Sequence, residues 1–221
     1  GYDRYDFEVN DQPAIVVDDI EAGRVRFERH QHGSQRARGG ARVAMITMLR
    51  DAIGRMSCNP AIGGLAKGNL VKEIDALGGL MGEATDRAGI QFKILNRSKG
   101  PAVQGPRAQC DRDLYATAVQ ELLAQEPNIT IIESSVSSLI LDGPAVRGVV
   151  LGAGAGLAGR AVLVTTGTLL RALMPSGEVQ TAGGRFGEPS AETLSDSLRT
   201  LGLQLGRLKT GTPPRVDRTT V

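Results

Sequence analysis

The sequence has few aromatic residues and no tryptophan: Phe, Trp and Tyr together make up 3% of its 221 residues. Glycine, in contrast, occurs 29 times. A chain of this length has ample material for a hydrophobic core. The shortage of aromatic side chains and the many glycines favour α/β packing with tight turns over an aromatic-rich β-sandwich.

The chain is also poor in cysteine, in net charge and in long apolar runs. Its two cysteines, Cys58 and Cys110, cannot form a disulfide framework, which indicates a reducing compartment. No apolar run approaches the length of a membrane span, and the first residues do not resemble a secretory signal. A net charge of +2 means that any contact with nucleic acid must come from local basic patches. We expect a soluble intracellular protein with no membrane partner.

Residues 1–40 are acidic in their first half and arginine-rich in their second half. The only strand they predict is a short one at 14–17. An arginine-rich arm for RNA is one interpretation. A disordered or non-native leader is favoured, because no apolar periodicity supports folding. His30 and His32 have no framework of further ligands around them, so we expect no metal site.

From residue 41 onward the patterns of regular structure are clear. Helices are predicted at 65–77, at 80–88 and from Pro106 through Leu123, with Cys110 packing on the first turns of the last one. Strands are predicted at 41–48, 90–94, 129–132, 136–141, 146–151 and 161–168. The pair Asp142-Gly143 predicts a hairpin, so the strands from 129 to 151 form a β-meander attached to a β-α-β unit.

Two glycine-containing segments give opposite indications about a cofactor. Gly154 to Gly159 fits the G-x-G-x-x-G pattern, but a strand follows it with no room for the required helix, so we predict a hairpin connection. The strand at 161–168 ends in Thr166-Gly167-Thr168. Small residues at the carboxyl end of a buried strand are typical of a cofactor-binding edge, although an ordinary strand exit has the same pattern.

Two further loops are rich in Gly, Pro and cations. The first, residues 96–107, carries Arg97 and Lys99, and the second, residues 206–215, carries Arg207, Lys209 and Arg215. Rigid loops with several cations favour contact with phosphate or RNA, whereas a solvated basic loop is the alternative. Before the second loop, Ser190 is predicted to cap a helix at 191–201 that Gly202 ends.

Cys58 lies in the stretch around which the rest of the chain is organised, RMSCNPAIGGLAKG at residues 55–68. The stretch places the thiol where a loop meets a helix, and the free N–H groups of a helix N-terminus favour a thiolate. A small buried cysteine in a turn is the alternative.

Several motifs in this order resemble the GidA/MnmG family: MSCNPAIGG, the run LVKEIDALGGLMGEATDRAGIQFKILNRSKGPAV, the TTGT strand end, GGRFGEPS and GRLKTGTPPR. The likeness runs from about residue 41 to the end of the chain. It implies the FAD subunit of the enzyme that adds a carboxymethylaminomethyl group to C5 of tRNA uridine 34. It also implies an α/β fold with a Rossmann-like FAD-binding domain of the glutathione-reductase type, an inserted β-meander, and an incomplete chain.

The resemblance further implies cofactors, partners and site residues. NADH reduces the FAD, methylenetetrahydrofolate donates the carbon, a GTPase subunit completes the complex, and full-length members form homodimers. Cys58 matches a cysteine proposed to be catalytic, and Arg97, Lys99, Arg207, Lys209 and Arg215 fall in loops that could meet tRNA. The positions implied to contact FAD are Ser57, Asn59, Pro60, Val136 (through its backbone), Thr166, Gly167, Thr168 and Ser190.

The sequence departs from the family in its first 40 residues, where the strand and GGGHAG loop that hold the FAD pyrophosphate have no counterpart. A shifted reading frame in a GC-rich gene would produce such an abrupt junction. We therefore divide the chain into an atypical leader, 1–40, and a partial FAD-binding domain, 41–221. The resemblance implies a cytoplasmic protein, or a mitochondrial one in a eukaryote, whose isolated activity is weak or absent. A folate- and FAD-dependent tRNA uridine methyltransferase and a non-catalytic RNA-binding fragment are the alternatives.

Overall fold

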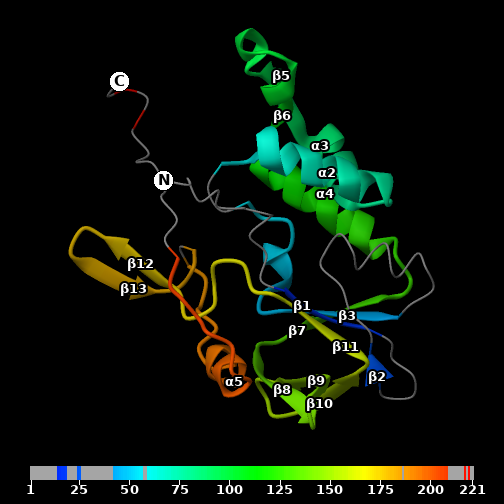
Figure 1. The fold of residues 1–221 in the computed structure, drawn as a ribbon, viewed down its shortest axis with the longest axis vertical. Helices are drawn as coiled ribbons and strands as arrows, with labels where there is room; N and C mark the ends of the chain where they lie inside the picture. The colour runs from blue at the N-terminus through cyan, green and yellow to red at the C-terminus, as the bar shows by residue number, and fades with distance from the viewer. Residues whose placement is uncertain are drawn as a thin grey trace.

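A four-stranded sheet lies at the centre of the fold, in the order β11-β1-β3-β7 (Figure 1). The computed structural model describes residues 14–18, 24–25, 42–56, 59–185, 187–208, 217 and 219. The strands of this sheet are β1 (Ala14–Asp18), β3 (Val43–Thr47), β7 (Ile129–Glu133) and β11 (Ala161–Thr165). β3 and β7 are parallel, whereas β1 is antiparallel to both of its neighbours, β3 and β11. β3, β7 and β11 therefore end at the same edge of the sheet.

β3 confirms the predicted buried strand. All five of its residues are buried, as expected for an apolar strand with partners on both sides. β1 confirms the short strand predicted near residue 14, and it pairs with β3 from Ala14↔Thr47 to Asp18↔Val43. A segment within residues 1–40 thus forms part of the central sheet.

The hairpin predicted within residues 136–151 is confirmed, but the strand predicted at 129–132 belongs to the central sheet as β7, so the predicted meander from 129 to 151 is wrong in its first strand. A second sheet has the order β2-β10-β9-β8 and contains β2 (Arg24–Val25), β8 (Val136–Asp142), β9 (Ala145–Leu151) and β10 (Gly156–Gly159). Gly143 has a φ of 57° in the turn between β8 and β9, as the Asp-Gly pair predicts. β10 pairs with β9, and residues 152–165 contain no helix, so the G-x-G-x-x-G match is not a dinucleotide-binding loop.

The stretch that follows the Cys58 turn forms a smaller α/β unit. It contains β4 (Ala61–Gly63), α2 (Leu65–Ala76), α3 (Leu80–Ala88), β5 (Gly89–Leu95) and β6 (Gly105–Cys110), and its sheet has the order β4-β6-β5. Gly63 has a φ of 115°, and a Cβ there would lie 2.1 Å from the Pro106 carbonyl oxygen. Only glycine allows β4 to approach β6 this closely. The hairpin of β5 and β6 projects beyond the helices (Figure 1).

The helix predicted from Pro106 begins six residues later, as α4 (Arg112–Ala124). Pro106 and Cys110 lie in β6, so their prediction as helical residues is wrong. The start is fixed by Asp111, whose carboxylate accepts hydrogen bonds from the backbone N–H groups of Asp113 and Leu114. A proline that suits a helix start was outweighed by strand pairing on both sides of β6. The prediction that Cys110 is a packing residue is confirmed, because it is buried.

The last described helix is shorter than predicted and Ser190 does not cap it. It is α5 (Leu194–Thr200), and it follows the hairpin of β12 (Leu173–Ser176) and β13 (Val179–Ala182). Gly202, with a φ of 81°, follows its end as predicted. Short 3₁₀ turns occur at η1 (Arg50–Ala52), η2 (Arg97–Lys99) and η3 (Pro101–Val103). In the part of the chain that the structure describes, every helix is too short or too polar to cross a membrane.

Candidate functional site

The predicted cofactor segment Thr166-Gly167-Thr168 forms the turn that follows β11. The Oγ1 atom of Thr168 is buried and has no hydrogen-bond partner among the described residues. A buried hydroxyl without a partner is costly in a folded protein, so it is a candidate ligand contact. Gly184 passes close by, since a Cβ there would lie 2.4 Å from the Thr168 carbonyl oxygen.

Ser190 ties this turn to the segment 183–191 instead of capping a helix. Its Oγ accepts a hydrogen bond from the Ala172 N–H at 2.8 Å and donates one to the Leu169 carbonyl at 3.3 Å. Leu170 and Ala191 form an isolated parallel bridge beside it. The structure thus brings together two segments that were predicted separately, Thr166–Thr168 and Ser190.

Val136 is the first residue of β8, and its side chain is buried in the core. A ligand could therefore reach only its main chain. This position is compatible with the predicted backbone contact, which stays a prediction.

Ser57 and Cys58 lie outside the described residues, but the residues after them are anchored. The Pro60 carbonyl accepts hydrogen bonds from the Cys110 N–H at 2.6 Å and from Nε2 of Gln109 at 3.1 Å. Asn59 is exposed, and its carbonyl accepts a hydrogen bond from the Ala61 N–H at 2.6 Å. Strand β6 therefore fixes the chain just beyond the predicted catalytic cysteine.

The residues before Cys58 are held by an ion-pair cluster formed by Arg55, Arg185 and Glu188, which we call the Glu188 cluster. Oε2 of Glu188 lies 3.0 Å from Nη2 of Arg185, and Oε1 lies 3.7 Å from Nη1 of Arg55. Nη1 of Arg185 also donates a hydrogen bond to the Arg55 carbonyl at 3.3 Å. The cluster connects the chain beside Cys58 to residues 130 positions away.

Glu188 was not predicted to be a site residue. The signal was available in GGRFGEPS, where one arginine and one glutamate lie three residues apart among glycines and a proline. The role of Glu188 also depends on Arg55, which is distant in the sequence. The spacing of residues in the segment alone therefore could not show the cluster.

The two predicted RNA-binding loops do not lie together. Arg97 and Lys99 belong to η2 between β5 and β6, and both are exposed. The Arg207 guanidinium donates two hydrogen bonds of 3.3 Å to the carbonyl of Arg171, whose side chain pairs with Asp196 of α5. Figure 1 shows α5 and the β5–β6 hairpin at opposite ends of the molecule. Lys209 and Arg215 lie outside the described residues, as do His30 and His32.

The fit of FAD to these residues is incomplete. The edge where β3, β7 and β11 end carries Thr168 with its unpartnered hydroxyl, which suits a polar ligand. Strand β1, however, runs antiparallel between β3 and β11, so its carboxyl end is at the opposite edge. Among the described residues, no glycine-rich turn and helix follow β1 to receive a pyrophosphate. The described residues offer contacts to part of the cofactor, and none of them is placed for its diphosphate.

The described residues contain no cluster of three or more His, Cys, Asp or Glu side chains placed to hold a metal ion. The titratable group with a distinct environment near the Cys58 segment is the Cys110 thiol. Burial raises its pKa above the ordinary value of 9.0, while the nearby Lys67 ammonium and a hydrogen bond with Thr85 lower it by less. The thiol is therefore neutral at physiological pH.

Comparison with known proteins gives one consistent result. The family described as glucose inhibited division protein A matches residues 33–221. The chain is 54% identical over 188 residues to the tRNA uridine 5-carboxymethylaminomethyl modification enzyme MnmG of Granulibacter bethesdensis, and 51% identical over 193 residues to that of Myxococcus xanthus. These matches cover 84% and 86% of this chain but only 30% and 31% of the relatives.

A solved structure of Aquifex aeolicus GidA superposes with a TM-score of 0.81 at 46% identity. The match covers 86% of this chain and 32% of that one. The chain thus spans about a third of the length of the proteins it matches.

Proposed function

The chain belongs to the glucose inhibited division protein A (GidA) family, and from this we propose that it is part of an enzyme that modifies tRNA uridine. The observation that carries the proposal is its identity of 54% and 51% to two tRNA uridine 5-carboxymethylaminomethyl modification enzymes, spread over more than four-fifths of the chain. The product would be the carboxymethylaminomethyl group on C5 of uridine 34.

The proposed cofactors and partners follow from the family. They are FAD, with NADH as reductant and methylenetetrahydrofolate as carbon donor, and tRNA, a GTPase subunit and a second copy of the full-length enzyme. The proposed division of the chain remains a leader, 1–40, and a partial FAD-binding domain, 41–221. We propose a cytoplasmic location.

Within this function, the described residues would position the reacting groups. Thr168 would donate or accept a hydrogen bond at the cofactor edge through its buried hydroxyl. The Glu188 cluster and the hydrogen bonds to the Pro60 carbonyl would hold the chain on both sides of Cys58. Cys58 would be the catalytic thiol. Because the described residues offer no helix N-terminus after β1 for the diphosphate of FAD, we propose that this chain alone is inactive or weakly active.

A chimera tests the proposal. Residues 41–221 would replace the matching segment of the Granulibacter bethesdensis enzyme, in a bacterium whose own enzyme of this kind is deleted. Mass spectrometry of digested tRNA should detect 5-carboxymethylaminomethyluridine derivatives with the chimera and only traces with its Cys58→Ala variant. A stable chimera that restores no modified uridine would contradict the proposal. Appearance of 5-methyluridine instead would support the methyltransferase alternative.

A further inference from the structure

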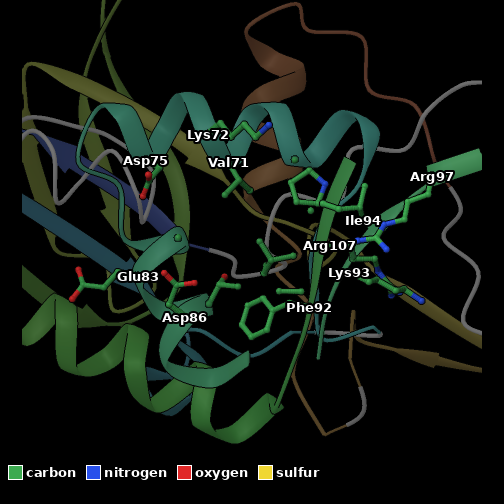
Figure 2. Close-up of a pocket in the computed structure, with 17 residues that line it drawn as sticks. Val71, Lys72, Asp75, Glu83, Asp86, Phe92, Lys93, Ile94, Arg97 and Arg107 are labelled. Carbon is green, nitrogen blue, oxygen red and sulfur yellow. The ribbon is translucent and has the colours of Figure 1, made fainter. Parts of the chain in front are cut away.

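A cavity of about 580 Å³ opens between helices α2 and α3 and the sheet of β4, β5 and β6 (Figure 2). None of the described residues that were predicted to contact the cofactor lines it. Its volume is in the range of sites that bind small molecules. Its apolar lining residues are Ile62, Val71, Phe92, Ile94 and Ala108, and Figure 2 shows Val71 and Phe92 near its middle.

Most charged residues of this cavity are grouped by sign, and the exception is Lys72, which lies on α2 with Asp75. Figure 2 shows the carboxylates of Asp75, Glu83 and Asp86 on one side, and Lys93, Arg97 and Arg107 on the other. The two groups come from different elements: the acids from α2 and α3, the cations from β5, η2 and β6. A ligand that spans the cavity would therefore meet cations at one end and carboxylates at the other.

Several of these charges have no ion-pair partner in the described part of the chain. This holds for Lys93 and Arg97 at the cationic end and for Asp75 and Asp86 at the acidic end. Glu83 differs, because it pairs with Arg87 at 2.6 Å. Arg107 donates a long hydrogen bond of 3.4 Å to Gln109. The cationic end thus has donors available for an anion, and the acidic end has acceptors available for N–H or O–H groups.

Phe92 contributes an aromatic surface between the two ends. Phe92 is 61% exposed, although phenylalanine side chains are usually buried, and it is one of only four phenylalanines in the chain. A Cβ on Gly89 would lie 2.2 Å from Cζ of Phe92, so the ring rests on a residue that has no side chain. Exposed aromatic rings beside cations are the platform on which proteins stack nucleic-acid bases.

We propose that this cavity binds one nucleoside 5′-phosphate unit. The phosphate would lie against Lys93, Arg97 and Arg107, and the base would stack on Phe92. The amino or ribose hydroxyl groups would donate hydrogen bonds to Asp75 and Asp86. Inorganic phosphate would leave the apolar middle and the acidic end unused, and an apolar ligand would leave both sets of charges unpaired.

The nucleotide could be free or part of an RNA chain, and the chemistry of recognition is the same. Its RNA form rests on the proposed function, since tRNA is the proposed substrate. Arg97 connects the proposed nucleotide site with the proposed RNA substrate, because it lies both in a loop predicted to meet RNA and in the wall of the cavity.

The test uses the full 221-residue chain and isothermal titration with AMP, adenosine and ribose 5-phosphate. AMP should bind more tightly than either part alone. Phe92→Leu, which keeps an apolar side chain but removes the ring, should weaken AMP binding by roughly tenfold, because a stacked base contributes about 1–3 kcal/mol. Lys93→Ala with Arg97→Ala should weaken AMP and ribose 5-phosphate but not adenosine.

Arg147→Ala is the matched control. Arg147 is an exposed cation on β9, paired with Asp142 and absent from the cavity wall, so its loss should not change AMP binding. All three residues to be replaced in the cavity are exposed, and circular dichroism would check that each variant is folded. Absence of AMP binding, or binding that the Phe92 and Lys93/Arg97 variants leave unchanged, would overturn the proposal.

Competition with an anticodon stem-loop RNA identifies the source of the nucleotide. Displacement of AMP by the RNA supports the RNA form. AMP binding that the RNA does not displace supports a site for free nucleotide and overturns the RNA form. Neither result depends on flavin or on uridine modification, so failure of the proposed function and failure of the cavity assignment can be told apart.

Discussion

Glu188 and Arg185 form a buried ion pair with 3.0 Å between Oε2 and Nη2, and their side chains are only 7% and 10% exposed. Arg55 shares the carboxylate and accepts a hydrogen bond from Arg185 through its own carbonyl. Removal of either partner of a buried ion pair destabilises a protein, because the other charge is then left in the interior without that partner. The pair therefore fixes how the segment 183–190 meets the chain beside Cys58.

Glu188→Ala should lower the free energy of unfolding by about 3–5 kcal/mol, because the buried Arg185 guanidinium would lose the carboxylate that lies 3.0 Å from it. Urea denaturation monitored by circular dichroism measures the change. Glu178→Ala is the matched control, since Glu178 is exposed in the turn between β12 and β13 and should change stability by less than about 0.5 kcal/mol. Equal effects of the two substitutions would contradict the importance of the cluster.

Cys110 should make the protein less stable at alkaline pH. Burial raises the pKa of this thiol above 9.0 in the folded chain, whereas the unfolded thiol ionises near its ordinary value. A raised folded pKa gives a contribution that is fully present below the unfolded pKa and is lost as pH rises toward the folded one. The free energy of unfolding should therefore fall as pH rises above about 9, by more in the native sequence than in Cys110→Ala. Urea denaturation at neutral pH and above pH 9 checks this, and an identical pH dependence in the two proteins would contradict it.

Most elements could be predicted from the sequence because their signals are local. Apolar spacing predicted α2 and α3, the Asp142-Gly143 pair predicted the β8–β9 turn, and the lack of room for a helix after Gly159 excluded a dinucleotide loop. The start of α4 was misplaced because strand pairing of β6 with two neighbours outweighed the local preference of Pro106. The reversed direction of β1 could not be predicted, since the pattern of a short apolar strand does not encode its direction in a sheet.

Only those site residues that belong to a short sequence motif could be predicted. Thr166–Thr168 were identified by their place at the end of a strand and by resemblance, Ser190 was identified as a cofactor contact by resemblance alone, and the structure joins their segments. The Glu188 cluster and the cavity beside Phe92 were missed, because each depends on residues from several elements that meet only in the folded chain. Periodicity identified Phe92 as a strand residue, but it could not show that the ring is exposed beside three cations.

Replacing Thr168 by valine separates a structural role from a ligand contact. The hydroxyl is buried without a hydrogen-bond partner in the described residues, so Thr168→Val should keep or raise the stability of the chain by up to about 1 kcal/mol. In the chimera with the Granulibacter bethesdensis enzyme, the same change should weaken FAD retention if the hydroxyl contacts the cofactor. Thermal unfolding and the flavin absorbance of the purified proteins are the two measurements. Loss of stability together with unchanged flavin content would show that the hydroxyl serves the fold.

The purified 221-residue chain should be colourless, or should contain flavin well below one equivalent. The reason is that the described residues offer no helix N-terminus for the diphosphate, since β1 ends at the opposite edge from β3 and β11. The chimera has the relative's own sequence before residue 41, where the resemblance implies a phosphate loop, and should be yellow. Both samples can be compared by their absorbance spectra after removal of free FAD. A yellow native chain with stoichiometric flavin would contradict the prediction.

The two basic loops should differ in their contribution to RNA binding. Arg207 already donates hydrogen bonds to the Arg171 carbonyl, whereas Arg97 and Lys99 are exposed on η2. Arg97→Ala with Lys99→Ala should therefore weaken tRNA binding more than Arg207→Ala with Lys209→Ala. The first double substitution should also reduce the slope of log K against log salt by about one for each phosphate that the protein no longer neutralises.

Filter binding across a range of salt concentrations measures both effects, with Arg147→Ala as the control for removal of a charge alone. Binding whose affinity and salt dependence survive both double substitutions would exclude these loops. A larger effect of the Arg207 and Lys209 substitutions would instead place the RNA at the α5 end of the molecule, because Arg207 is held there by the Arg171 carbonyl.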